Sequence, residues 1–440
     1  MNGLVAAPED VSLVRAIGVR QLAAGVFNMI VGAGIFLLPG SVAAKVGSAA
    51  PLAYLLCAVA VGLVMVCFAM AGSRVTVTGG PYAYAEAAFG PLTGFLTGFL
   101  YWSACVLGVA AVANGFASSV IGLMPSSSSE PLRLALLASI ISGVAFLNVR
   151  GVRHGAAVVE VTTLVKILPL IFFVAFGLAA AKPEALRWPS WPRVDLLGQA
   201  VLSIFFAFMG GEAALQPSEE IRNPERTIPR SIFSAMAAIT LLYLGIHLAT
   251  QGALGNELSD YEGKNALTEA AGRFLGPSGA LMIALAAAVS MFGYVSGDLL
   301  ASPRMFLAFG RKGFLPAWLA RIHPRHRTPS VAIGGYATLV FAIAASARFQ
   351  RLADLCSVMT LLVYLVCCLA AWKLQKLDVR GSAAPFQIRG VRVVPWVAAA
   401  CVVWILSQAS AAEFGVAGGV AAVGFAIYGL RQWRLKRING

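Results

Sequence analysis

Three charged residues, Lys166, Glu212 and Asp298, lie inside long apolar stretches of this 440-residue sequence. Ionisable side chains are rare in such stretches, and they usually face the interior of a helical bundle, on proton or solute pathways. Burial disfavours the charged form of a lysine, which makes Lys166 a candidate for proton exchange. The alternative is that its long side chain reaches the nearby surface, since Glu160 and a loop are only a few residues away.

The stretch from Gly25 to Val46 carries glycine at positions 32 and 34, near its middle. Each glycine in a helix interior costs about 1 kcal/mol relative to alanine, so a helix is predicted to break at residues 32–34. The next half-helix would begin near Ile35 with unpaired amide N–H groups and a positive dipole end, which suit a carboxylate. The alternative is that both glycines let another helix pack closely. On the binding interpretation, leucine at Gly34 would abolish binding and leave the protein folded.

The composition is that of an integral membrane protein: 59% of the residues are hydrophobic, 12% are charged, and the mean hydropathy is +0.81. About 20 consecutive apolar residues cross the hydrocarbon core as a helix. We expect twelve transmembrane helices, at residues 18–45, 49–72, 91–121, 131–149, 158–181, 196–217, 230–253, 278–307, 329–347, 353–375, 393–411 and 414–431. Irregular backbone at membrane depth is tolerated only where protein buries it or where it lines a cavity. On this argument, residues 32–34 form the floor of a binding site.

The sixth span repeats the interruption of the first, because Gly210 and Gly211 stand directly before Glu212. Corresponding interruptions in two halves of a chain are typical of inverted-repeat transporters, whose binding site lies near the membrane midplane. The predicted parts are a first repeat at 18–181, a second repeat at 196–375, two peripheral helices at 393–431, and end segments at 1–17 and 432–440.

Two further spans have a polar face. In the eighth span, Ser290, Tyr294 and Asp298 follow one another at intervals of four residues, which places them on one side of a helix. In the third span, Tyr101 and Asn114 belong to a polar face that could line a cavity. Ordinary interfacial or interhelical contacts explain each of these third-span residues equally well when it is taken alone.

The net charge of +14 reflects topology and does not indicate a nucleic-acid surface. With twelve spans, most of the 33 lysines and arginines fall on the side that holds both ends of the chain. Because cytoplasmic loops carry an excess of lysine and arginine, both termini are expected in the cytoplasm.

The remaining chemistry-bearing residues indicate neither a metal site nor an enzyme. The seven cysteines fall inside expected spans without CxxC spacing, and the four histidines form no metal-ligand pattern. A membrane enzyme would need a clustered nucleophile and base, and the sequence shows none. A channel would need a continuous polar pore, and two isolated helix breaks argue against one.

Four segments together resemble the amino acid-polyamine-organocation transporters, and specifically their bacterial amino acid permeases. The segments are Gly32-Ala-Gly-Ile-Phe36, Thr78 to Glu86, Phe208-Met-Gly-Gly-Glu212 with residues 218–230, and residues 302–316. The resemblance covers nearly the whole chain. It implies an all-α integral membrane protein with twelve transmembrane helices: two inverted five-helix repeats with broken helices 1 and 6, plus two peripheral helices. Such a protein works by alternating access in the bacterial inner (plasma) membrane.

The resemblance also implies a site. The substrate carboxylate would meet the amides near Ala33 to Ile35. The substrate amino group would meet the carbonyls of Phe208 and Met209. The Phe206 ring would close over the bound substrate. Lys166 matches a lysine of sodium-independent members, which stands where sodium-coupled relatives hold an ion. Glu212 matches a glutamate implicated in proton sensing. The expected substrate contacts are Ile30, Gly32, Ala33, Gly34, Ile35, Tyr101, Val109, Phe206, Phe208, Met209 and Asp298.

Sequence leaves the substrate class open. Val109 stands where the related arginine/agmatine antiporter has asparagine, which argues against that exact exchange. Asp298 either contacts a cationic substrate or pairs with a proton relay or a buried donor. The other presumed contacts are apolar, which favours small or branched neutral amino acids moved with protons. The alternative is an exchanger of cationic amino acids or polyamines. We expect no cofactor besides the proton, a monomer or homodimer in lipid, and no nucleic-acid partner.

Overall fold

The computed structural model describes residues 17–75, 79–122, 129–150, 152–188, 190–215, 221–305, 309, 314–316, 318, 321–323, 326, 328–379, 385–386 and 392–439, with backbone alone at 152–165, 215, 224 and 438–439. The expected end segment 1–17 therefore lies outside the described residues except for Ile17. Its backbone pairs with Ile221, in the segment before a later helix, and the amide of Arg222 donates to the carbonyl of Ile17 at 3.0 Å.

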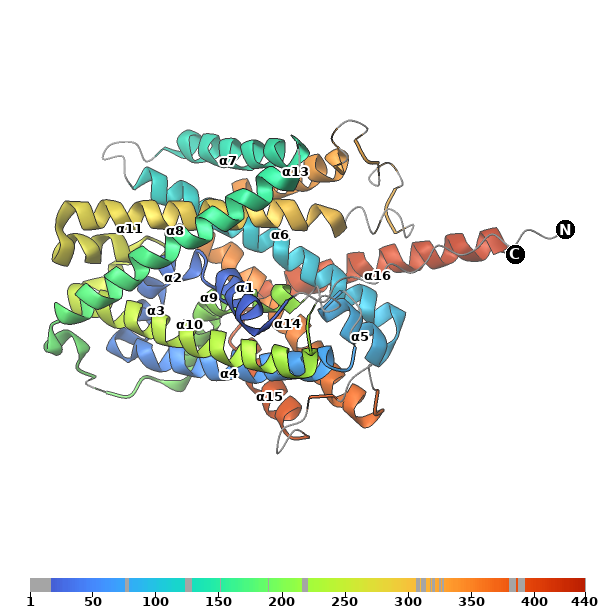
Figure 1. Ribbon diagram of the computed structural model, residues 1–440, viewed down its shortest axis with the longest axis horizontal. Coiled ribbons are helices and arrows are strands. Elements are labelled where there is room, and N and C mark those ends of the chain that lie inside the picture. The colour runs from blue at the N-terminus through green and yellow to red at the C-terminus, as the bar shows by residue number, and fades with distance from the viewer. Residues whose placement is uncertain are drawn as a thin grey trace.

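The described chain is helical, which confirms the all-α part of the predicted fold class. The α-helices are α1 (Val19–Ile30), α2 (Gly34–Leu37), α3 (Pro39–Val46), α4 (Ala50–Gly72), α5 (Pro81–Phe89), α6 (Pro91–Ile121), α7 (Glu130–Arg150), α8 (Val152–Ala179), α9 (Val194–Phe208), α10 (Pro224–Leu254), α11 (Ala266–Ala301), α13 (Ser330–Ser346), α14 (Phe349–Lys376), α15 (Val394–Leu406) and α16 (Ala411–Asn439). Most of them run along the long axis of the molecule, and α16 projects past the bundle (Figure 1).

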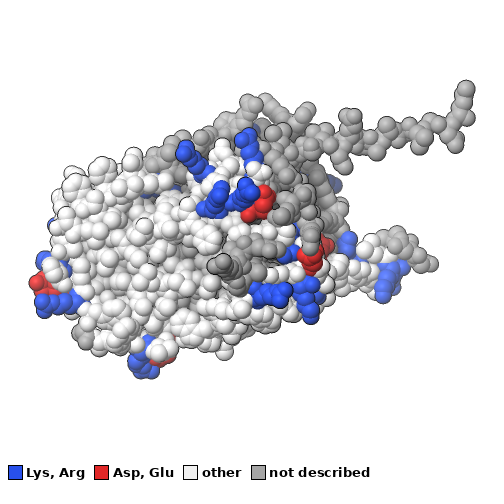
Figure 2. All heavy atoms as spheres, turned by 60° about the horizontal axis from the view of Figure 1, so that its bottom comes forward, with Lys and Arg blue, Asp and Glu red and all other residues white. Residues whose placement is uncertain are grey.

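Within the described residues, nine helices are long and apolar enough to cross a membrane, and three shorter apolar helices lie at Lys166–Ala179, Ser330–Ser346 and Val394–Leu406. Each of the twelve expected spans overlaps one of these helices. The number of crossings itself stays a prediction. Figure 2 shows a broad surface without charged residues, and lysine and arginine gather mainly toward the end from which α16 projects. This distribution suits a protein embedded in lipid.

Both predicted helix breaks are present. The first helix ends at Ile30, its C-cap Val31 leaves the helical region with φ −74° and ψ 87°, and α2 resumes at Gly34. The second break follows Phe208, where Gly210 has φ +103°, a conformation that favours glycine. A 3₁₀ turn, η3 (Gly211–Leu215), continues the chain. The glycines therefore interrupt both helices where the sequence predicts.

The two broken helices cross in direct contact. A Cβ atom added at Gly34 would lie 2.7 Å from the Cα atom of Ala207 on α9. Three pairs of helices pack around this crossing: α10 against α1, α8 against α11, and α6 against α14. The core is therefore built around the two breaks, and these helices determine which side chains reach them.

Candidate functional site

A cavity of about 450 Å³ lies between the two helix breaks and the helices α6, α8 and α11. Its volume falls within the range of about 300–1,000 Å³ that is usual for small-molecule sites. Its lining residues are Asn28, Met29, Gly32, Tyr101, Cys105, Lys166, Gly210, Ala213, Ser290, Gly293, Tyr294, Gly297, Asp298, Leu300, Ala301 and Ser302. Both breaks, at Gly32 and Gly210, thus border the same space.

Lys166 points from α8 to the first break. Its side chain is 6% exposed, and Nζ donates hydrogen bonds to the carbonyl oxygens of Asn28 at 2.9 Å and Val31 at 2.6 Å. These carbonyls belong to the end of α1, where the helix offers them no intrahelical partner. The amino group therefore stabilises the break, and it does not reach the protein surface.

A tyrosine on α10 connects the two breaks. The hydroxyl of Tyr243 lies 3.0 Å from the carbonyl oxygen of Ile30 and 3.0 Å from that of Ala207. Its ring packs edge-on against Phe208 at a centroid distance of 5.0 Å. Tyr243 is fully buried, so it links the ends of α1 and α9 without facing solvent.

Asp298 lines the cavity, and both of its carboxyl oxygens accept hydrogen bonds. Oδ1 accepts from the Ser302 hydroxyl at 2.8 Å, and Oδ2 accepts from the Tyr336 hydroxyl on α13 at 2.6 Å. The carboxyl is thus held by two neutral donors. This is the buried-donor arrangement that the sequence left open beside a direct substrate contact.

Glu212 lies at the second break and is 2% exposed. Oε2 accepts a hydrogen bond from the Gly210 amide at 3.0 Å and another from the Tyr364 hydroxyl on α14. Gly210, which donates to this carboxyl, also lines the cavity. A change of protonation at Glu212 would therefore be felt directly at the cavity.

The structure brings only part of the predicted site together. Gly32, Tyr101, Asp298 and Lys166 line the cavity. The residues that lie elsewhere are Ile30, Ala33, Gly34, Ile35, Val109, Phe206, Phe208, Met209 and Glu212. Phe206 packs edge-on against Phe349 of α14 at a centroid distance of 5.7 Å instead of covering the cavity. The role of these residues as substrate contacts or proton carriers stays a prediction.

The two glycines of the first break have different surroundings. Gly34 faces the Ala207 backbone, so a larger residue there would push α2 away from α9 and disturb the fold. This corrects the expectation that leucine at Gly34 leaves the protein folded. A Cβ atom at Gly32 would meet its nearest neighbour, Cδ2 of Tyr294, at 3.8 Å, an ordinary contact. Gly34 is thus a packing glycine, and Gly32 is the one that borders the cavity.

Sequence reasoning assigned no site role to several lining residues. Ser290 and Tyr294 follow the helical spacing that pointed to Asp298, and that spacing could have identified them. The Ser290 hydroxyl is buried without a hydrogen-bond partner among the described residues. Asn28 and Cys105 gave no comparable signal, because their position depends on how α1 and α6 rotate against the bundle.

The protein has a cavity between two broken membrane helices and a buried lysine that donates to the carbonyls of the first break. This arrangement is typical of membrane transporters. The chain belongs to the amino acid permease family, which matches residues 17–428, within the amino acid-polyamine-organocation superfamily. It is a multi-pass membrane transporter of small molecules, and it is not an enzyme.

Three relatives from Bacillus subtilis align along most of their length. A methylthioribose transporter is 27% identical over 92% of this chain and 91% of its own. A serine/threonine exchanger is 28% identical over 84% of this chain and 85% of its own. A branched-chain amino acid permease is 26% identical over 90% of this chain and 89% of its own. The relatives thus share the transporter class and differ in what their names say they carry.

Proposed function

We propose that this protein is a secondary active, proton-coupled amino acid transporter of a bacterial inner membrane that works by alternating access, with both termini in the cytoplasm. The observation that carries the proposal is the Lys166 amino group on the carbonyls of Asn28 and Val31, at the edge of the cavity. A protonated amine held by carbonyl oxygens there can take the place of a coupling metal ion, so the proton on Lys166 replaces sodium.

Proton loss from Lys166 gives a physical route to coupling. Hydrogen bonds that involve a charged group contribute about 1.5–3 kcal/mol, against about 0.5–1.5 kcal/mol for neutral pairs. Deprotonation would therefore weaken the connection between α8 and the first break by about 1 kcal/mol or more per bond. A change of this size shifts the balance between two conformations of the transporter. Glu212, at the second break, is the second candidate proton carrier.

The substrate that we propose is a small or branched neutral amino acid. Asp298 is hydrogen-bonded by Ser302 and Tyr336, so it needs no cationic ligand to satisfy its oxygens. The substrate carboxylate would approach the amides that begin α2, next to Gly32, and the amino group would approach the carbonyls that end α9. The branched-chain permease and the serine/threonine exchanger among the relatives support a neutral substrate.

A second candidate is the exchange of cationic amino acids or polyamines. It is favoured by one observation, the Asp298 carboxyl in the lining of the cavity. A cationic side chain could pair with this carboxylate, whereas an ionised Asp298 beside a neutral ligand would stay uncompensated. The two candidates therefore differ in what they predict for arginine and putrescine.

Uptake by proteoliposomes tests the proposal. In sodium-free buffer, an inward proton gradient should drive saturable uptake of alanine or leucine, and unlabelled substrate inside should produce counterflow. Dependence on sodium at constant pH, or indifference to the proton gradient, would contradict the coupling. Tight, selective binding of arginine or putrescine would replace the neutral substrate with the second candidate.

A further inference from the structure

A second and larger cavity, of about 680 Å³, adjoins the one between the helix breaks. The two share Tyr101, Cys105, Ala301 and Ser302 in their linings, so one set of side chains separates them. The larger cavity, which we call the vestibule, is lined by residues of α5, α6, α11 and the end of α16. A solute that leaves the central cavity past Tyr101 and Ser302 would enter it.

One side of the vestibule is an aromatic cluster made of Phe95, Phe309, Phe314 and Tyr428. The rings of Phe95 and Phe314 stack at a centroid distance of 4.3 Å, and Tyr428 of α16 lies 5.6 Å from Phe95. The guanidinium of Arg431 lies 4.3 Å from the centre of the Phe314 ring. A stacked guanidinium keeps its N–H donors in the plane of the group, where they can still bind a carboxylate.

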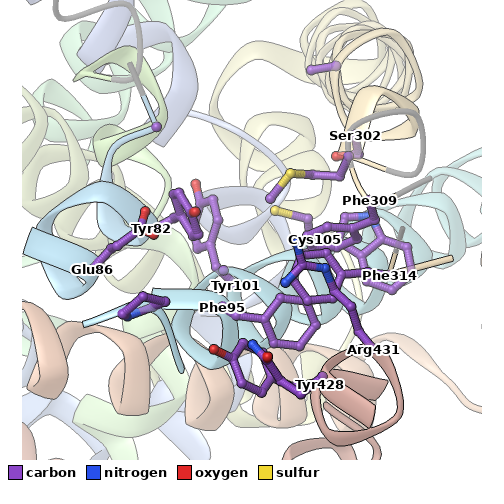
Figure 3. Close-up of a pocket in the computed structure, with 17 residues that line it drawn as sticks. Tyr82, Glu86, Phe95, Tyr101, Cys105, Ser302, Phe309, Phe314, Tyr428 and Arg431 are labelled. Carbon is purple, nitrogen blue, oxygen red and sulfur yellow. The ribbon is translucent and has the colours of Figure 1, made fainter. Parts of the chain in front are cut away.

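Glu86 lies across the vestibule from this cluster. Figure 3 shows Tyr82 and Glu86 on one side of the cavity and Arg431 with Phe314 on the other. Among the described lining residues, Glu86 is the only acid and Arg431 the only base. A zwitterion with an apolar side chain matches this arrangement. Glu86 can pair with its ammonium group, Arg431 can pair with its carboxylate, and the aromatic rings can contact its side chain.

We infer that the vestibule is a second binding site for the transported amino acid, in which Arg431 binds the carboxylate and the aromatic cluster binds the side chain. The inference rests on the proposed function. It gives α16, which the sequence analysis treats as peripheral, a direct place on the solute pathway. Because α5 and the end of α16 lie on the side assigned to the cytoplasm, the site acts on solute that enters or leaves there.

Arg431→Gln tests the inference, and Arg434→Gln is the matched control. Arg434 lies three residues further along the same helix, is exposed, and does not line the vestibule. Exchange is measured in proteoliposomes of known protein orientation, with the amino acid concentration varied on one side at a time. Arg431→Gln should raise the half-saturation concentration on the cytoplasmic side about tenfold, as for loss of a charge-assisted hydrogen bond. The opposite side should keep its wild-type value.

The outcomes separate the two claims. If wild-type protein exchanges no amino acid, the proposed function fails. If wild-type protein exchanges and Arg431→Gln matches Arg434→Gln on both sides, only the vestibule site is refuted, and the cavity holds lipid or solvent. Should Arg431→Gln fail to fold, Tyr428→Leu provides the second test, because it removes one ring of the cluster. It should raise the cytoplasmic half-saturation concentration about threefold, and an unchanged value would refute the site.

Discussion

Replacing Gly34 and Gly32 in turn by alanine separates packing from binding at the first helix break. At Gly34, the new methyl group would lie 2.7 Å from both Cα and Cβ of Ala207, about 1 Å closer than ordinary carbon contacts. Neither atom can rotate away, because Cα is backbone and Cβ is bonded directly to it. At Gly32, the nearest atom, in the Tyr294 ring, is 3.8 Å away, and no strain arises.

The magnitudes follow from these contacts. Overpacking of this kind costs about 1–3 kcal/mol, and the helix preference of alanine over glycine recovers up to about 1 kcal/mol. We therefore expect Gly34→Ala to lose about 1–2 kcal/mol of stability. Gly32→Ala should stay within about 0.5 kcal/mol of wild type but weaken substrate binding about tenfold, because its methyl group occupies space in the cavity.

Thermal melting of purified protein in detergent, with and without amino acid, measures both effects. Gly34→Ala should melt below wild type even without substrate. Gly32→Ala should melt as wild type alone but need about tenfold more amino acid for the same ligand-induced shift. The reasoning would be refuted if Gly34→Ala melted like wild type, or if Gly32→Ala bound substrate with unchanged affinity.

Three further variants test other contacts. Lys166→Ala should abolish the response of uptake to a proton gradient, and a retained response would remove Lys166 from the coupling step. Asp298→Asn should change leucine or alanine uptake less than threefold, because Tyr336 can still donate to the amide oxygen; a large loss confined to arginine or putrescine would favour cation exchange. Arg133→Gln should cost about 1.5–3 kcal/mol in thermal melting, because Arg133 is 4% exposed and its charged guanidinium donates to Asn114 Oδ1 at 2.6 Å and to two carbonyls of α13 at 3.1 Å. Arg193→Gln, at an exposed arginine, is the control. Equal melting temperatures of the two variants would contradict a stabilising role of Arg133.

The helix breaks could be predicted because they depend on local chemistry. Glycine pairs in the middle of apolar spans are costly in any helix, and Gly210 adopts a positive φ that other residues avoid. The side of α11 that carries Asp298 was predictable for a similar reason, since residues four positions apart share one side of a helix. Lys166 could be placed inside the bundle because an unpaired charge in lipid is costly.

The position of Phe206 could not be predicted, because it depends on the conformation of the transporter. Here Phe206 packs against Phe349, and Ser41 of α3 donates to Gln350 of α14 at 3.0 Å. These contacts hold α9 and α3 against α14, and Phe206 does not line the cavity. A resemblance assigns a residue its family role, but the packing decides where its side chain lies in any one state.

The vestibule was equally hidden from sequence reasoning. Phe95, Phe314 and Tyr428 come from parts of the chain that are more than a hundred residues apart in every pairing. Aromatic residues near the ends of membrane spans are common at lipid interfaces. The packing of α16 against α6 brings Tyr428 to Phe95, and Phe314 stacks on the same Phe95 ring.

Protection of Cys105 by substrate tests most directly whether the amino acid binds on the pathway formed by the cavity between the helix breaks and the vestibule. Cys105 lines both cavities, whereas Cys57, Cys67, Cys356, Cys367 and Cys368 are buried. Half-buried Cys401 is removed beforehand as Cys401→Ser. Alkylation of Cys105 by a maleimide is followed by mass spectrometry at increasing amino acid concentration. The rate should fall with the same half-saturation concentration as uptake, and an unchanged rate with an amino acid that the protein transports would contradict the site.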